Sequence, residues 1–346
     1  MEPVAEDASR PWAEPGIYEV AAGVYRIPLP LPNDGLRAVN VYAITDGSEL
    51  VMIDSGWALQ EARDQLEVAL KAIGAGFGDV SRFLVTHVHR DHYTQAVVLR
   101  REFGNRIALG EHERTSLEIT ARPDGSPINA QIEQLRQAGA GPVVEELRKL
   151  FGGARTSEAD IWEMPDEWLT TGRRTVLGSR ALDVVHTPGH TAGHVVFDDA
   201  AAGLMFTGDH VLPHITPSIG FHPASAELPL RDFLDSLRLV RGMPDRRMLP
   251  AHGPVSPSVH ARVDELLAHH DDRLDKVVET LSEGTSTAYE SARKLGWTRR
   301  QRRLGELDPF NQMLAVTETK AHLDLLAHRG RLAVSEVDGV RHYTRR

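Results

Sequence analysis

The chain contains no cysteine among its 346 residues. Disulfide bonds, thiolate metal ligands and a cysteine nucleophile are therefore excluded. No apolar run approaches the roughly 18 residues of a membrane span. The first residues, Met-Glu-Pro-Val-Ala-Glu-Asp, are acidic and lack the basic and apolar regions of a secretory signal. These absences predict a protein that neither crosses a membrane nor is exported, with the cytoplasm as its expected location.

Positive charge is also scarce, because 39 Lys and Arg face 49 Asp and Glu and leave a formal net charge of −10. This balance argues against broad electrostatic binding of nucleic acid, although it is compatible with a local basic patch. The only dense basic run is Arg299-Arg300-Gln-Arg302-Arg303. Such a run is typical of a solvated helix start with salt bridges to nearby acids. The alternative is a patch that binds phosphate or an acidic carrier protein.

The alternation of apolar runs and turn signals predicts a layered α/β fold. Two alternating runs, 39–45 and 50–54, flank Asp46-Gly47 and predict a β-hairpin. Apolar residues at helical spacing predict a helix that ends at Gly74, and short apolar runs predict strands at 83–86, 107–109, 181–186, 195–198 and 204–207. Strands that alternate with helices, with polar residues in the loops, indicate layers of helix and sheet.

The composition predicts that the chain is divided into three segments. Residues 1–16, with three prolines and four acids, are expected to form a flexible N-terminal arm. Residues 17–257 are expected to form the main domain, with a helical insertion at about 111–165. Residues 258–346 follow a proline-rich boundary and are expected to form a small domain of three helices and a terminal hairpin. That order is typical of a winged-helix-like module.

Seven residues that can ligate metals stand at or just beyond the ends of predicted strands. They are His87, His89, Asp91, His92, His190, Asp209 and His252. The first two histidines are two positions apart, so they project to the same side of an extended segment. Imidazole nitrogens and carboxylate oxygens are the ligands that borderline divalent ions such as zinc prefer. The pattern therefore predicts a metal site rather than a set of structural or solvated side chains.

The order and spacing of these motifs resemble the metallo-β-lactamase-fold hydrolase superfamily over roughly residues 20–257. The resemblance implies that residues 17–257 are the catalytic domain and form a four-layer αββα sandwich. It also implies two divalent metal ions. The first would be held by His87, His89 and His190, the second by Asp91, His92 and His252, and Asp209 would bridge them. Zinc is the expected metal, and iron or manganese would fit the same ligands.

Five further residues are expected near the metals: Asp54, Tyr93, His194, His210 and His214. Asp54 matches an Asp that family members place beside the site, and we expect it to hold a ligating histidine, with a purely structural role as the alternative. His194 is expected to give similar support or to touch substrate. Tyr93, His210 and His214 are candidates for shaping the pocket or contacting substrate, with ordinary loop packing as the alternative.

The resemblance implies hydrolysis by a hydroxide that bridges the two ions, with Asp91 orienting it and accepting its proton. Asp209 stands where antibiotic-hydrolysing members usually have Cys or Ser, and His89 stands where flavodiiron oxygen reductases usually have Glu. Both of those classes are therefore disfavoured. The expected substrate is an acyl thioester or related ester, either small or carrier-bound, because the acidic charge disfavours nucleic acid.

Two other functions stay open. The segment Asp308-Pro-Phe-Asn-Gln and the hairpin after it resemble lactamase-like proteins that end in a winged-helix-like domain. Animal members of that group are associated with cleavage of single-stranded RNA, and fungal relatives with thioester hydrolysis on carrier proteins. A single-strand endoribonuclease or phosphodiesterase is therefore the second hypothesis, and a non-enzymatic nucleic-acid-binding regulator is the third. The helical insertion is expected to roof the site or to support a homodimer contact.

Overall fold

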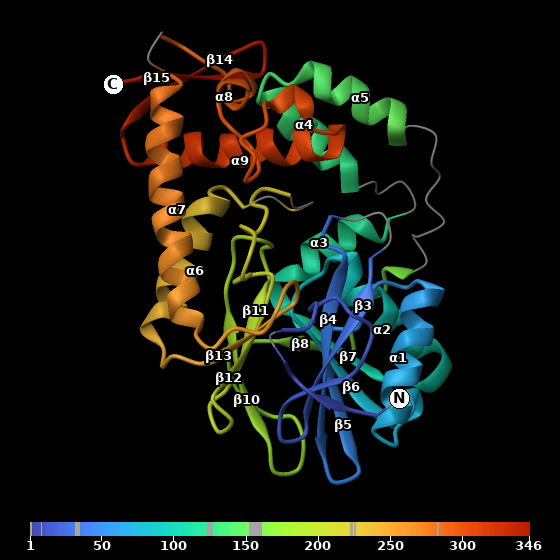
Figure 1. The fold of residues 1–346 in the computed structure, drawn as a ribbon. Coiled ribbons are helices and arrows are strands. Elements are labelled where there is room, and N and C mark those ends of the chain that lie inside the picture. Colours follow the sequence, from blue (N-terminus) through green and yellow to red (C-terminus); the bar gives the residue numbers. More distant parts are fainter. Residues whose placement is uncertain are drawn as a thin grey trace.

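The computed structural model describes residues 2–7, 9–31, 35–122, 127–151, 161–221, 224, 226–281 and 284–346. Two β-sheets pack face to face, and helices cover the outer face of each (Figure 1). The layers are helix, sheet, sheet and helix, which is the αββα sandwich that the sequence predicts. Among the helices that the structure describes, none is both long and apolar enough to cross a membrane.

The first sheet has eight strands whose order in space follows the chain. They are β1 (Val4–Ala5), β2 (Tyr18–Ala21), β3 (Val24–Pro30), β4 (Ala38–Asp46), β5 (Glu49–Ile53), β6 (Val80–Val85), β7 (Arg106–Gly110) and β8 (Glu167–Leu169). The predicted hairpin is β4 and β5, which pair antiparallel up to the turn between Asp46 and Glu49. From β5 to β8 the strands run parallel, because helices connect them.

The second sheet contains five strands in the order β13-β12-β11-β10-β9. Their bounds are β9 (Gly172–Thr175), β10 (Ala181–His186), β11 (Val195–Asp199), β12 (Leu204–Gly208) and β13 (Arg247–Pro250). β12 and β13 run parallel, and helix α6 (Pro229–Gly242) connects them. The carboxyl ends of both strands therefore meet at the same edge of the sheet.

Side-chain alternation along β4 explains why this strand can be buried on both faces. Val41 and Ala43 pack toward helices α1 (Gln60–Ala72) and α2 (Arg90–Phe103), in the cluster that contains Leu66. Tyr42 and Ile44 point the other way and pack against the second sheet. Because successive side chains of a strand face opposite sides, one apolar run supplies two layers of the core.

The C-terminal region contains α7 (Val259–Glu279), α8 (Ala288–Lys294), α9 (Pro309–His328) and the hairpin β14 (Leu332–Val337) and β15 (Val340–Arg345). Ser286 adds a single bridge to Tyr343 of β15. The three helices and the hairpin occur in the predicted order. Leu266 of α7 and Val316 of α9 belong to the same buried cluster as Leu234 of α6. This region thus shares its core with the sandwich, and its independence as a winged-helix-like domain stays a prediction.

The predicted insertion contains α3 (Arg114–Thr120), α4 (Pro127–Gln137) and α5 (Gly141–Phe151). Leu135 of α4 and Val144 of α5 lie in the buried cluster that α9 also enters. The backbone N–H of Tyr289 donates to the carbonyl of Ala138 at 3.0 Å. The insertion therefore packs against the C-terminal helices, and its expected roles as a roof or dimer contact remain predictions.

The N-terminal arm is anchored where the structure describes it. Strand β1 pairs with β2, and the buried Arg26 guanidinium binds Glu6 at 2.9 Å. The same guanidinium donates to the carbonyl of Trp12 at 2.7 Å and to Asn40 Oδ1 at 2.9 Å. These contacts hold the described part of the predicted flexible arm against the first sheet.

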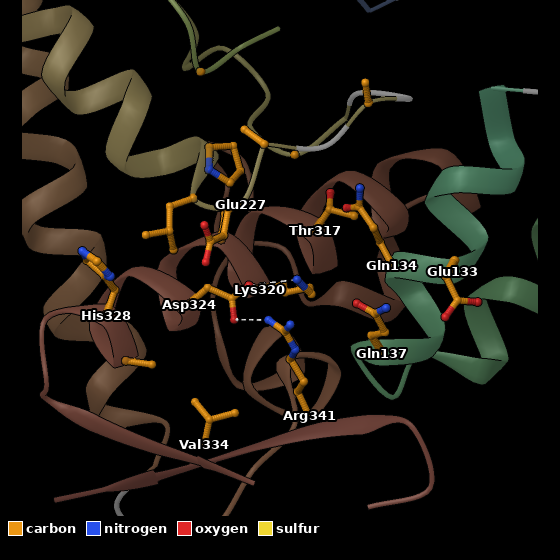
Figure 2. A pocket seen from close by; sticks show the side chains of 18 of the residues that line it. Glu133, Gln134, Gln137, Glu227, Thr317, Lys320, Asp324, His328, Val334 and Arg341 are labelled. Carbon is orange, nitrogen blue, oxygen red and sulfur yellow. Dashed lines mark hydrogen bonds and ion pairs between the residues drawn. The ribbon is translucent and has the colours of Figure 1, made fainter. Parts of the chain in front are cut away.

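A network of charged side chains fastens the terminal hairpin to α9. Figure 2 shows Lys320, Asp324 and Arg341 on the wall of a cavity of 790 Å³ that the loop before β11 also lines. Asp324 accepts from Tyr343 Oη at 2.7 Å, Lys320 Nζ at 2.8 Å and Arg341 Nη1 at 3.2 Å. The charged groups on this wall of the cavity therefore pair with one another, and the pairing attaches the hairpin to α9.

Candidate metal centre

The seven predicted ligands converge at one end of the sandwich. The segment His87–His92 leaves the end of β6, His190 follows β10, Asp209 directly follows β12, and His252 follows β13. Strands in a sheet are rigid, so a side chain just beyond a strand end is fixed without a long loop. The fold brings all seven residues together in two adjacent groups.

The first group consists of His87, His89, His190 and Asp209. His89 Nδ1 lies 2.9 Å from His87 Nε2 and 3.1 Å from His190 Nε2. Asp209 Oδ2 lies 3.5 Å from His190 Nε2 and 4.0 Å from His87 Nε2. Donors that share one ion at about 2.1 Å stand roughly 3–4 Å apart, so this group has the dimensions of one coordination sphere.

The second group consists of Asp91, His92 and His252, and the second carboxylate oxygen of Asp209 faces it. His252 Nε2 lies 3.3 Å from Asp91 Oδ2 and 3.4 Å from Asp209 Oδ1. His92 Nε2 lies 3.5 Å from Asp91 Oδ2 and 3.7 Å from Asp209 Oδ1. Asp209 therefore directs one oxygen at each group, which is the geometry of a bridging ligand.

Buried polar atoms that lack a hydrogen-bond partner indicate whether metal ions fit this site. Within the part of the chain that the structure describes, His92 Nε2, His252 Nε2 and Asp209 Oδ1 are buried and make no hydrogen bond. Such atoms are costly unless a ligand satisfies them. The opposite ring nitrogens are held: His92 Nδ1 by Asp54 at 2.8 Å, and His252 Nδ1 by the carbonyl of Ala38 at 2.7 Å. This arrangement is typical of metal-ligating histidines, and the donor set fits two divalent ions.

At His87 and Asp91, the shifts in pKa favour the protonation state that binds metal. Burial, followed by the neighbouring His92 and His89, lowers the pKa of His87 well below its usual value, so its ring is neutral. Burial alone would raise the pKa of Asp91, but His92 and His252 outweigh burial and hold that pKa well below its usual value. Burial would lower the pKa of His92, but the carboxylates of Asp91 and Asp54 raise it well above its usual value. Metal binding must therefore displace a proton from His92.

Asp54 connects the loop after β5 to the metal cluster. Its backbone has a φ of 59°, in the left-handed region that Asp and Asn tolerate better than most residues. Its Oδ1 accepts from the backbone N–H of Thr86 at 2.8 Å, while Oδ2 holds His92. The Thr86 hydroxyl lies 3.0 Å from both Asp54 oxygens and 3.1 Å from His87 Nδ1. The geometry supports the expected role of Asp54 and adds Thr86, which the sequence analysis missed although it directly precedes the motif.

Substitution of Asp54 by asparagine is expected to weaken metal binding by about 10- to 100-fold, because His92 loses its charged partner. Asparagine keeps the side-chain shape and tolerates the positive φ, so the fold should survive. Competition with a chelator of known affinity measures the change, and the exposed Asp64→Ala serves as the control. Unchanged metal affinity would leave Asp54 with a purely structural role.

Three of the other predicted neighbours, His194, Tyr93 and His210, are buried side chains. His194 is buried, with Nδ1 2.9 Å from the Thr187 hydroxyl and Nε2 accepting from the backbone N–H of Asp209 at 3.1 Å. It thus holds the backbone of Asp209 rather than facing solvent. Tyr93 is also buried and donates to the carbonyl of Glu163 at 2.5 Å. His210 is buried against Phe233, and burial lowers its pKa to about 3.

His214 is exposed, on the segment that continues from Asp209 toward α6. Its carbonyl accepts from Arg299 Nη2 at 2.7 Å. The same segment supplies the carbonyl of Ser218, which lies 2.9 Å from His190 Nδ1. Sequence reasoning missed the contributions of Ser218 and Ala38, because a backbone carbonyl leaves no signal in residue type.

An αββα sandwich that brings five histidines and two aspartates together in two adjacent groups has the features of a metal-dependent hydrolase. The family model described as the metallo-beta-lactamase superfamily matches residues 34–252. The chain belongs to this superfamily.

Similar proteins carry hydrolase names. The chain is 25% identical over 310 residues to a probable metallo-hydrolase, YqjP, of Bacillus subtilis, covering 87% of this chain and 90% of that protein. It is 25% identical over 266 residues to an atrochrysone carboxyl ACP thioesterase of Aspergillus fumigatus, covering 77% of this chain and 49% of that protein. A crystal structure of a metallo-beta-lactamase family protein from Thermus thermophilus superposes with a TM-score of 0.78 at 27% identity, covering 95% of this chain and 100% of that one.

Proposed function

We propose that this protein hydrolyses acyl thioesters or related esters at a centre of two divalent metal ions, most simply zinc. The observation that carries the proposal is Asp209, which presents one oxygen to His190 and the other to His252. A carboxylate between two donor groups suits a site that holds two cations side by side. The similarity to a protein named as an ACP thioesterase supports the choice of substrate.

Each residue group has a separate task in this proposal. When bound, the two ions would polarise the substrate carbonyl and lower the pKa of water from about 15.7 toward about 7. Asp91, ionised at neutral pH, would orient the attacking water and accept its proton. Asp54 and Thr86 hold His92 and His87 in position, and His194 does the same for the backbone of Asp209. No covalent intermediate with the protein is required.

One observation favours an anionic partner and keeps the RNA alternative open. Among the described residues, the side chains of Arg299, Arg300, Arg302 and Arg303 form no ion pair with a carboxylate, whereas the sequence analysis expected salt bridges as the simpler explanation. Arg299 lines a cleft of 1350 Å³ together with the cationic side chains of Arg262, Arg273, Lys276 and Lys294 and the acidic side chains of Asp272, Glu279 and Glu318. Guanidinium groups without a carboxylate partner can bind a phosphate of a carrier-bound thioester or of RNA.

Metal analysis and a substrate panel test the proposal together. Protein never exposed to chelator is expected to contain about two divalent ions per chain and to hydrolyse acyl thioesters, and chelation should abolish turnover until metal is restored. Lactones and short RNAs complete the panel, with Asp91→Ala as the inactive control. Metal content well below one ion per chain would refute the central claim. RNA cleavage that is lost in Asp91→Ala, without any thioesterase activity, would reverse the choice of substrate.

A further inference from the structure

A pair of phenylalanines connects the C-terminal helix α9 to the metal centre. The Phe221 ring lies 5.9 Å from the ring of His89, measured between centroids. The Phe221 ring also forms a T-shaped pair with the Phe310 ring, with centroids 5.5 Å apart and an interplanar angle of 76°. Phe310 is 41% exposed although it is large and apolar. The metal centre therefore has an aromatic surface beside it that is open to solvent.

Local sequence places Phe310 at this position. The Asp308 side chain accepts from the backbone N–H of Asn311 at 3.0 Å and so caps α9. Pro309 follows at the start of the helix, where its missing N–H costs nothing. Phe310 is thus fixed in the first turn of α9, and its side chain stays exposed while Met313 and Val316, one and two turns later, enter the core.

The backbone just before Phe221 lies in van der Waals reach of the same helix. Gly220 has a φ of 90°, which a residue with a side chain rarely adopts. A Cβ atom at this position would lie 3.5 Å from the carbonyl oxygen of Thr317 on α9. The segment that carries the His190 partner Ser218 therefore rests on α9 just before Phe221. Both phenylalanines are held by backbone features and not only by their mutual contact.

Room for a substrate lies next to the pair. The cleft of 1350 Å³ is lined by Ile215 and Ser218, which precede Phe221 in the chain, and by Asn311 and Leu314, which follow Phe310. Leu314 comes four residues after Phe310, so the two side chains lie on the same side of α9. The start of α9 and the segment before Phe221 therefore contribute both to the aromatic pair beside His89 and to the lining of this cleft.

We propose that Phe221 and Phe310 form the wall that receives the acyl group of the substrate, so that α9 of the C-terminal region selects among acyl groups. This inference rests on the proposed thioesterase function and deepens it. It assigns to the C-terminal region a direct part in substrate binding. Each methylene removed from water against an apolar surface changes binding by about 4-fold, so the wall favours long or aromatic acyl groups over acetyl.

The test compares acyl groups on one constant thiol, using the metal-loaded full chain. Thioesters of N-acetylcysteamine with acetyl, decanoyl and benzoyl groups differ only in the part that the wall would contact. Phe310→Ala is expected to lower kcat/KM for decanoyl and benzoyl thioesters by about 10-fold or more, equivalent to contact with about two methylenes, and for acetyl by less than about 3-fold. Phe310→Leu should restore most of the decanoyl activity.

Phe103→Ala is the matched control. Phe103 is 43% exposed and packs against another phenylalanine, Phe77, at 5.5 Å, but it lies at the opposite end of α2 from His92. This variant should leave all three thioesters unaffected. Metal content, measured for each variant, should stay at the wild-type level, because the Phe310 ring packs on Phe221 and the candidate metal ligands are all histidines and aspartates.

The outcomes separate this inference from the function on which it rests. Wild-type protein that hydrolyses no thioester would refute the proposed function. Wild-type activity with no loss in Phe310→Ala, or with an equal loss for acetyl and decanoyl groups, would refute the acyl wall alone. RNA cleavage by the wild-type protein that Phe310→Ala impairs, with thioester hydrolysis unchanged, would assign the aromatic pair to base stacking and also overturn the inference.

Discussion

Replacement of Asp209 by alanine is expected to lower kcat/KM for hydrolysis by at least about 10³-fold, which corresponds to about 4 kcal/mol of lost transition-state stabilisation. The reason is that one carboxylate serves both groups of donors, with Oδ2 near His190 and Oδ1 near His252. Its loss removes one donor from each coordination sphere and the negative charge between them. Elemental analysis should show fewer than two ions per chain, alongside the fall in turnover.

The fold should survive this substitution, because Asp209 is held through its backbone N–H, which the alanine variant keeps for His194. Circular dichroism and thermal unfolding test that point. Asp235→Ala, which removes an exposed carboxylate from the surface of α6, is the matched control and should keep full activity and its full complement of metal. Full metal occupancy in Asp209→Ala would contradict a bridging role.

The candidate ligands could be located from sequence because they follow strands that the apolar pattern reveals, either within a few residues of the strand end or, for Asp91 and His92, in the first turn of α2. Their assignment to two metal ions came from the resemblance and stays a prediction. The runs before His87 and Asp209 became β6 and β12, as predicted, and the two sheets then bring distant strand ends together. Membership of the metallo-beta-lactamase superfamily supports the predicted sandwich. These features were accessible because strand periodicity and ligand type are both local properties of the chain.

Features that depend on tertiary packing could not be predicted from the sequence. Tyr93 and His210 had the polar groups expected of pocket residues, yet both are buried and pack within the protein. The insertion was predicted as helical, but its contact with α9 joins segments far apart in the chain. No residue pattern predicts that Phe310 of α9 meets Phe221 beside His89, because that contact depends on how α9 docks against the sandwich.

Replacement of Asp91 by asparagine is expected to lower kcat by about 10²- to 10⁴-fold even when the second metal position is saturated. Asparagine matches the shape of Asp91 and keeps an oxygen donor for the second metal, but it cannot accept a proton from water. His252→Asn is the comparison: it removes a donor of the same group, 3.3 Å from Asp91, while leaving the carboxylate in place. Excess metal should restore much of the activity of His252→Asn and little of that of Asp91→Asn. Equal recovery of both variants would mean that Asp91 only binds metal and that another group accepts the proton.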